Sequence, residues 1–334
     1  MDTKQLNAIA LQMVAPGKGI LAADESTSTA GKRFEKIGLE NTETNRRDYR
    51  EMLFTAPEIG EYISGVIMYD ETFRQSSAEG VPFVKLLESE SVLPGIKVDE
   101  GTYDMPGSST EKLTKGLEGL PPRLAEYAQM GAKFTKWRAV ITIGENIPTD
   151  ANIRQNAKDL AAYAKMVQDA GMVPMVEPET LMDADNSLQK CAEVSEKVLT
   201  AVFEELKNAG VAMEGMILKT GMVVPGKKSG EKATSAQVAD ATLAVFKKTL
   251  PDNLPGQAFL SGGQSEVEAT ANLNEMNKRG PLPWKLSFSY GRALQDSALQ
   301  AWAGKSENVA RGQVALIERA KKNSQATLGT YQGE

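Results

Sequence analysis

The chain has no histidine among its 334 residues and a single cysteine, Cys191. Without histidine it lacks the usual proton shuttle at neutral pH and the commonest ligand of transition metals. Ser–His–Asp and Cys–His nucleophile systems are therefore excluded, as is a zinc site that uses histidine. One cysteine can form neither an internal disulfide nor a cysteine-rich metal site. The chemistry must rest on Lys, Arg, Asp, Glu, Ser, Thr or Tyr, and the metals left open are hard, oxygen-ligated cations such as magnesium.

Long apolar runs are missing too. No stretch approaches the roughly 18 apolar residues that predict a membrane span. Residues 1–19 carry Asp2 and Lys4 and lack the uninterrupted apolar segment of a signal peptide. The net charge of −6 and the absence of a basic run with interleaved aromatic residues argue against nucleic-acid binding. We therefore expect a cytoplasmic protein that binds neither membranes nor nucleic acid, and in which an anionic ligand needs a local group of cations.

Short β-rich runs alternate with longer amphipathic stretches, and Pro or Gly stands at many of the junctions. The eight predicted strands are Gly19–Asp24, Gly65–Asp70, Gly95–Asp99, Phe134–Val140, Met172–Glu177, Glu214–Lys219, Gln257–Ser261 and Lys285–Ser289. The helical stretches include Thr42–Thr55, Ala151–Ala170, Leu188–Ala209, Ser235–Leu250 and Glu266–Lys278. This alternation predicts a (β/α)₈ TIM barrel in a single domain over residues 1–334. We expect residues 101–122 to form a long loop and residues from about 324 to 334 to form a C-terminal tail.

Charged side chains stand at the ends of five predicted strands, where they alternate with apolar residues such as Ile96 and Val98. Residues two apart on a strand point to the same face. Because the outer face of a barrel packs against helices, we expect the charges to point inward, near the strand ends where barrel active sites lie. They are Asp24, Lys97, Asp99, Lys136, Arg138, Glu177, Glu179 and Lys219. A structural ion-pair network is the alternative interpretation, and a single such lysine alone is more often a solvated strand end.

Two glycine-containing loops follow the seventh and eighth predicted strands, where barrels often bind phosphate. They are Ser261-Gly262-Gly263 and Ser289-Tyr290-Gly291-Arg292. Glycine lets backbone N–H groups approach a phosphate, a following helix N-terminus favours the anion, and arginine adds a bidentate contact. Together the loops predict a phosphate site. A second cluster, with four hydroxyl residues at 26–29 followed by Lys32 and Arg33, is open between a phosphate site and an ordinary helix N-cap.

Seven segments, in order along nearly the whole chain, resemble the class I fructose-1,6-bisphosphate aldolases. They are Ala15–Ser26, Glu40–Glu43, Gly95–Asp99, Lys136–Arg138, Val176–Glu179, Leu260–Glu266 and Phe288–Leu294. The resemblance implies a lyase without metal or cofactor. Its implied reaction is the reversible cleavage of fructose 1,6-bisphosphate into dihydroxyacetone phosphate and glyceraldehyde 3-phosphate, in glycolysis and gluconeogenesis. A homotetramer is the usual assembly of the family.

The resemblance also implies a role for each site residue. Lys219 attacks the C2 ketone to form a Schiff base, and Glu177, with Glu179 beside it, moves protons in the carbinolamine and imine steps. Asp24, assisted by Lys136, takes the proton of the C4 hydroxyl during C3–C4 cleavage. The implied substrate-binding residues are Ser261, Gly262, Gly263, Gly291 and Arg292 around the C1 phosphate, Thr29 and Lys97 around the C6 phosphate, and Arg46, Arg138 and Ser289 at other contacts.

The nucleophile must be an unprotonated amine, and we expect burial and the neighbouring charge of Lys136 to favour that form of Lys219. The protonated imine then accepts electrons, a role that zinc has in the metal-dependent aldolases. Two features depart from the family pattern. Many members have Lys-Pro-Asn where this chain has Lys219-Thr220-Gly221, and we expect a freer backbone there. The sequence ends at Glu334 without the terminal tyrosine that assists proton transfer in many animal enzymes, so another group or water must replace it.

Three other functions stay open at this point. The chain could be a related Schiff-base aldolase that acts on another ketose phosphate. It could be a scaffold or sugar-phosphate-binding protein that has lost turnover, as the change after Lys219 would permit. A magnesium-dependent barrel lyase is the third.

Overall fold

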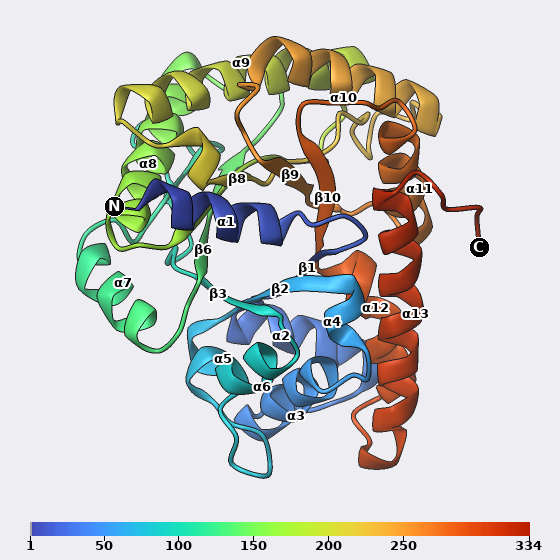
Figure 1. Cartoon of the computed structure of the whole chain (residues 1–334). Helices are drawn as coiled ribbons and strands as arrows, with labels where there is room; N and C mark the ends of the chain where they lie inside the picture. The colour runs from blue at the N-terminus through green and yellow to red at the C-terminus, as the bar shows by residue number, and fades with distance from the viewer. Residues whose placement is uncertain (1) are drawn as a thin grey trace.

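Eight parallel strands close into a barrel in the computed structural model, which describes residues 2–334. Around the barrel the order is β1-β10-β9-β8-β7-β6-β3-β2 (Figure 1). These strands are β1 (Gly19–Ala23), β2 (Ile63–Met68), β3 (Leu93–Lys97), β6 (Phe134–Ile141), β7 (Val173–Thr180), β8 (Ile217–Leu218), β9 (Gly256–Phe259) and β10 (Lys285–Tyr290). The predicted (β/α)₈ barrel and all eight of its strands are confirmed.

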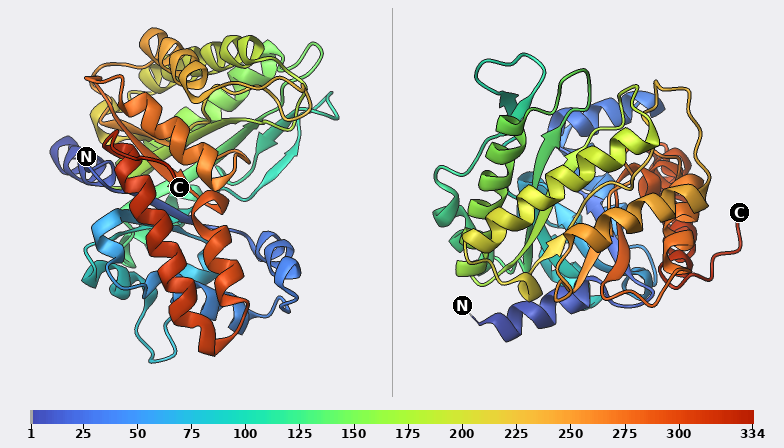
Figure 2. Two further views of the ribbon diagram at one scale, coloured as in Figure 1. Left: turned by 90° about the vertical axis from the view of Figure 1, so that its right-hand side faces the viewer. Right: turned by 90° about the horizontal axis from the view of Figure 1, so that it is seen from above.

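Helices surround the strands on the outside of the barrel (Figure 2). They are α1 (Thr3–Met13), α2 (Thr27–Phe34), α3 (Glu43–Phe54), α4 (Ile59–Tyr62), α5 (Asp70–Arg74), α6 (Phe83–Ser89), α7 (Leu120–Gln129), α8 (Asp150–Asp169), α9 (Leu188–Asn208), α10 (Ser235–Thr249), α11 (Glu266–Asn277), α12 (Arg292–Trp302) and α13 (Val309–Thr327). Capping residues in the sequence fix where several of these helices begin. Thr234 with Gln237, and Ser265 with Glu268, form reciprocal capping boxes at α10 and α11. No helix within residues 2–334 is long and apolar enough to cross a membrane.

All eight predicted strands differ from the observed ones by one residue or more at an end, and four differences matter for the path of the chain. Asp70 begins α5 instead of ending a strand, and residues 213–215 form a 3₁₀ turn, η2 (Met213–Gly215), which leaves β8 only two residues long. The expected loop at 101–122 contains a two-stranded hairpin, β4 (Thr102–Asp104) with β5 (Lys112–Thr114), and the first residues of α7. Residues 324–327, predicted as tail, are the last turn of α13. Strands of three residues are too short to show a period in the sequence.

The strands separate two apolar layers, as the alternation predicted. Outward residues such as Leu21, Ile96 and Trp137 pack under the helices. Inward residues such as Ile20, Phe134 and Met175 fill the barrel together with Leu6, Ala10 and Met13 of α1. The whole inner layer is thus apolar towards the N-terminal ends of the strands, and α1, in front of the strands in Figure 1, covers that end. The inward-pointing polar side chains therefore lie at the C-terminal ends of the strands.

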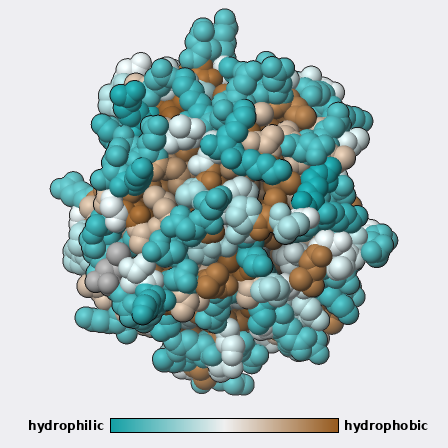
Figure 3. Space-filling model, turned by 45° about the horizontal axis from the view of Figure 1, so that its top comes forward, coloured by the Kyte–Doolittle hydropathy of each residue, from teal (hydrophilic) through white to brown (hydrophobic). Residues whose placement is uncertain are grey.

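Hydrophilic side chains cover most of the face seen in Figure 3, with apolar residues in small groups between them. The large apolar side chains that are most exposed, Val314 and Leu328, lie on or directly after α13. Single exposed apolar residues are normal for a folded protein.

Candidate active site

A cavity of about 830 Å³ opens at the C-terminal ends of the barrel strands. All eight charges predicted to point inward line it: Asp24, Lys97, Asp99, Lys136, Arg138, Glu177, Glu179 and Lys219. Thr29, Ser261, Gly262, Ser289, Gly291 and Arg292 line it as well. Residues from five of the eight strands, and from the segments that follow the strands, therefore converge on one space. Packing alone does not require so many charges in the mouth of a barrel.

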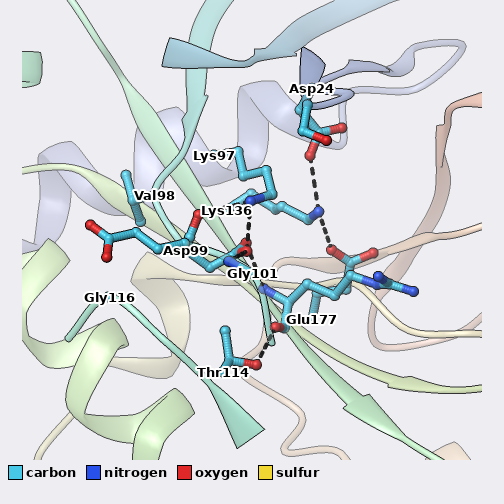
Figure 4. A network of polar contacts seen from close by, with 12 residues as sticks. Asp24, Lys97, Val98, Asp99, Gly101, Thr114, Gly116, Lys136 and Glu177 are labelled. Carbon is cyan, nitrogen blue, oxygen red and sulfur yellow. Dashed lines mark hydrogen bonds and ion pairs between the residues drawn. The ribbon is translucent and has the colours of Figure 1, made fainter. Parts of the chain in front are cut away.

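Lys136 stands at the centre of the charges. Its Nζ lies 2.9 Å from Asp24 Oδ2 and 2.9 Å from Glu177 Oε2, so one ammonium bridges carboxylates from β7 and from the end of β1 (Figure 4). Burial alone raises the pKa of Asp24, but the charges of Lys136 and Lys219 outweigh it and hold that pKa well below its ordinary value. Burial lowers the pKa of Lys136, and Asp24 and Glu177 more than offset it, so that pKa is raised. Asp24 is therefore an anion and Lys136 a cation at neutral pH.

Lys219 follows the last residue of β8 and is buried, with only 3% of its surface exposed. Its Nζ lies 3.4 Å from Glu177 Oε1, opposite the oxygen that faces Lys136. The Lys219 backbone N–H donates to the carbonyl of Val176, which fixes the side chain's origin beside β7. Its amine is thus buried beside one carboxylate at the base of the cavity. The arrangement suits an amine that reacts with an electrophile entering the cavity.

Two further ion pairs line the walls. Arg138 Nε pairs with Glu179 Oε2. Lys97 Nζ donates to Asp99 Oδ1 at 2.6 Å and to the Asp99 carbonyl at 2.8 Å, while the other Asp99 oxygen accepts from the backbone N–H of Arg138 (Figure 4). These contacts link the ends of β3, β6 and β7. Within residues 2–334, no group of three or more His, Cys, Asp and Glu side chains is placed to hold a metal ion.

The two predicted phosphate loops lie side by side at one edge of the cavity, since β9 and β10 are neighbours in the barrel. Gly262 and Gly263 have φ values of +57° and +91°, the left-handed region that favours glycine. Ser289 is 1% exposed, and its Oγ has no hydrogen-bond partner among the described residues. Gly291 directly precedes α12, whose first residue is Arg292. Backbone N–H groups, an unpaired hydroxyl and a guanidinium thus face the same space, as an anion site requires.

Two predicted binding residues lie elsewhere. Arg46, on α3, pairs with both carboxylate oxygens of Glu71 and does not line the cavity. Gly263 lies one residue beyond the lining, although a side chain there would approach Arg292. Thr29 reaches the rim from the first turn of α2, where Ser26 accepts a hydrogen bond from its backbone N–H. The cluster at 26–33 is therefore a helix N-cap, and it also borders the cavity.

Seven charged or aromatic lining residues were given no role in the site: Glu25, Arg33, Tyr69, Asp70, Glu100, Arg123 and Tyr127. Of these, Arg33 was part of the cluster at 26–33 that the sequence left open. Glu25 forms ion pairs with Arg33 and with Arg50, which lies beneath it on α3. One signal was available for Asp70, because it ends the predicted second strand as Asp24 ends the first. Arg123 and Tyr127 come from α7, and only the packing of that helix against the barrel mouth brings them to the site.

Comparisons with known proteins agree with this geometry. Residues 5–334 match the family model described as glycolytic, fructose-bisphosphate aldolase class-I. A probable fructose-bisphosphate aldolase class 1 of Xanthomonas campestris is 51% identical over 334 residues, which is 100% of both chains. The cytosolic fructose-bisphosphate aldolase 4 of Arabidopsis thaliana is 51% identical over 99% of this chain and 85% of its own.

The fold agrees as well. The solved structure of the fructose-bisphosphate aldolase from Plasmodium falciparum, in complex with TRAP and a small-molecule inhibitor, superposes with a TM-score of 0.98. It is 48% identical and covers 99% of this chain and 96% of its own. Identity near one half over complete chains, together with a superposable barrel, leaves one conclusion. The chain belongs to the class I fructose-bisphosphate aldolase family.

Proposed function

We propose that the chain cleaves fructose 1,6-bisphosphate reversibly into dihydroxyacetone phosphate and glyceraldehyde 3-phosphate through a Schiff base on Lys219. The observation that carries the proposal is the position of Lys219. It is buried at the centre of the cavity, with its Nζ 3.4 Å from Glu177 and with the two loops of an anion site at the edge of the same cavity. Family membership supports the reaction, and the geometry supports the assignment of the nucleophile.

The proposed covalent steps begin with the addition of the Lys219 amine to the C2 carbonyl of the open-chain ketose. The carbinolamine loses its hydroxyl as water when Glu177 donates a proton to it, and a protonated imine remains. Glu179, two residues along β7 and paired with Arg138, is proposed to assist Glu177 as the second carboxylate of the site. The cationic imine nitrogen is then the electron acceptor for the next step.

Cleavage requires a base at the C4 hydroxyl. Asp24 is proposed for this role because Lys136 and Lys219 lower its pKa and so keep it ionised. When the C4 hydroxyl loses its proton, the C3–C4 bond breaks, its electron pair moves to the imine nitrogen, and glyceraldehyde 3-phosphate leaves. The enamine takes up a proton at C3, and hydrolysis of the new imine releases dihydroxyacetone phosphate and the Lys219 amine. Lys136 stabilises the negative charge that passes through this part of the site.

The substrate's phosphates are proposed to bind at opposite sides of the cavity. Ser261, Gly262, Gly291 and Arg292 hold the C1 phosphate, with Gly263 shaping the loop, and Ser289 contacts the substrate between them. Thr29 and Lys97 hold the C6 phosphate. Arg46 is assigned no direct contact, because it pairs with Glu71. The alternative is that the enzyme acts on another ketose phosphate. Equal kcat/KM values for fructose 1,6-bisphosphate and fructose 1-phosphate would favour this alternative, because the second phosphate would then contribute nothing.

Assembly, location and cofactor use are proposed on the family alone. We propose a homotetramer in the cytoplasm that needs neither metal nor cofactor, and relatives named as cytosolic isozymes in plants support the location. Unchanged activity after dialysis against EDTA is the expected behaviour, and a loss restored by magnesium would favour the magnesium-dependent alternative.

Borohydride trapping tests the mechanism directly. The protein is reduced with sodium borohydride in the presence of dihydroxyacetone phosphate and mapped by peptide mass spectrometry. We expect one stable adduct, on Lys219, and none in Lys219→Met, whose kcat should fall by about 10⁴-fold or more. Lys97→Met serves as the matched lysine control and should still form the Lys219 adduct. No adduct in the wild type, or an adduct confined to Lys97 or Lys136, contradicts the mechanism.

A further inference from the structure

A short ladder of backbone hydrogen bonds fixes the loop after β8 beside the loop after β7. Gly226 N–H donates to the Asn186 carbonyl at 2.8 Å, Lys227 N–H to Met182 at 2.8 Å, and Lys228 N–H to Ala184 at 2.9 Å. The approach is close enough to require glycine, because a Cβ on Gly226 would lie 2.2 Å from the Ala184 carbonyl oxygen. The backbone of Lys227 is therefore held at a defined place.

That place lies against the Ser261-Gly262-Gly263 loop. A Cβ on Gly262 would lie 2.7 Å from the sulfur of Met182, on one side of the ladder. A Cβ on Gly263 would lie 2.3 Å from Lys227 Nζ and 3.3 Å from Arg292 Nη2. The ammonium of Lys227 and the guanidinium of Arg292 therefore flank the same glycine. The lack of a side chain at 263 is what lets Lys227 come this near.

These two cations lack close carboxylates. Arg292 forms no ion pair with any residue of the described chain, 2–334, although it lines the cavity. The carboxylate paired with Lys227 is Asp183, at 3.9 Å, and that carboxylate is 76% exposed. Lys227 is not itself among the residues that line the cavity, whereas Arg292 is. Three cations of the cavity wall, Lys97, Lys136 and Arg138, each have a carboxylate within 3 Å. Two neighbouring like charges whose one counter-charge is distant and exposed favour the binding of an anion.

We propose that Lys227 is a further phosphate-binding residue, which contacts the C1 phosphate of the sugar from above the Ser261–Gly263 loop. This rests on the proposed function, because it assigns an additional cation to the same phosphate. Lysine suits the position, since its ammonium is a point charge on a flexible stem and reaches inward without leaving its fixed backbone. Lys227 would supply charge where Arg292 supplies a bidentate hydrogen bond.

The test compares Lys227→Gln with Lys228→Gln. The two variants change the charge equally at adjacent positions, and it is the ammonium of Lys227, not that of Lys228, that lies nearest to a Cβ placed on Gly263. Lys227→Gln should raise KM about fivefold for fructose 1,6-bisphosphate and equally for fructose 1-phosphate, because both carry the C1 phosphate. Its kcat should stay within about twofold, since an exposed binding cation acts alike on ground and transition states. Lys228→Gln should match the wild type.

Calorimetric titration with dihydroxyacetone phosphate separates this proposal from the proposed reaction, because it needs no turnover. Weaker binding in Lys227→Gln than in Lys228→Gln supports the phosphate contact even if the wild type cleaves neither sugar, in which case the proposed reaction fails alone. Equal KM and equal affinity in the two variants overturn the role of Lys227 and leave the reaction intact. A KM change for the bisphosphate alone also overturns it, since that pattern belongs to the C6 phosphate.

Discussion

Thr220 joins the strand that carries Lys219 to the strands on either side of it. Its Oγ1 donates to the carbonyl of Pro178, between the two glutamates of β7, at 3.1 Å. Its own carbonyl accepts from the backbone N–H of Leu260 at 3.1 Å, one residue before the Ser261 loop. Many family members have proline at this position, and proline has no hydroxyl to make the first of these bonds. The departure from the family pattern therefore adds a hydrogen bond between the residues that follow Lys219 and Glu177, the proposed nucleophile and proton donor.

Replacing Thr220 with valine keeps the shape of the side chain and removes the hydroxyl. The buried Pro178 carbonyl then loses its partner, which costs about 1–3 kcal/mol of unfolding free energy. Because the register of Glu177 against Lys219 loosens, we expect kcat to fall about tenfold and KM to change little. Steady-state kinetics, the rate of borohydride-trapped imine formation and urea unfolding measure these effects.

The hydroxyl-retaining control for this position is Thr220→Ser, which should recover most of the trapping rate. A Thr220→Val protein that is less stable but forms the imine at the wild-type rate would show that the bond only supports the fold.

Site residues on strands were easier to predict than those on helices. Lys136 and Glu177 could be placed because side chains on a strand alternate between two faces. Helices pack on the outer face, so a charged side chain must point into the barrel. Glu25 and Arg33 could not, because their roles depend on Arg50 approaching from α3 and on Gln295 from α12. The pairing of Arg46 could not be predicted for the same reason, because its partner Glu71 lies on a different element, α5. Pairings between helices far apart in sequence leave no local signal.

At the scale of elements, α1 completes the barrel by filling its N-terminal end. Leu6 is 1% exposed and packs with inward residues of the strands, while Leu11 of the same helix is 47% exposed. Gly215 of η2 admits the helix, because a Cβ there would lie 3.0 Å from Leu6 Cβ. This explains why the sixth predicted strand is shortened. Gly215, inside the predicted strand 214–219, belongs to a turn whose shape depends on packing against α1. Nothing in the sequence of residues 214–219 indicates that packing.

The contribution of α1 can be measured with a matched pair on the same helix. Leu6→Ala removes buried methyl groups and leaves a cavity, so it should lower the free energy of unfolding by about 2–5 kcal/mol. Leu11→Ala, which makes the same chemical change at an exposed position, should change it by less than about 0.5 kcal/mol. Because α1 lies at the end of the barrel opposite the cavity, both folded variants should keep the wild-type kcat. Equal destabilisation by the two substitutions would show that α1 does not close the core.

At the scale of the whole molecule, a negatively charged body carries a site that has to attract a polyanion. The net charge is −6, whereas the cavity holds Lys97, Lys136, Arg138 and Lys219. Most of these cations are paired with carboxylates inside the cavity, whereas Arg292, which also lines it, forms no ion pair among residues 2–334. Attraction therefore acts at short range near the Ser261–Gly263 loop, while the repulsion from the surface is spread over the molecule.

The dependence of KM on ionic strength distinguishes the attraction by the cations of the site from the repulsion by the acidic surface. At about 0.1 M salt the Debye length is about 10 Å, so distant surface charges are screened before contacts inside the site. Raising the salt concentration from about 0.02 to 0.3 M should therefore increase KM about three- to tenfold for fructose 1,6-bisphosphate and less for fructose 1-phosphate, which carries one phosphate. Sodium acetate and sodium chloride should act alike if screening is the cause, and Lys227→Gln should show a smaller slope. A KM that falls as salt is added would mean that repulsion by the acidic body, rather than the local cations, governs binding.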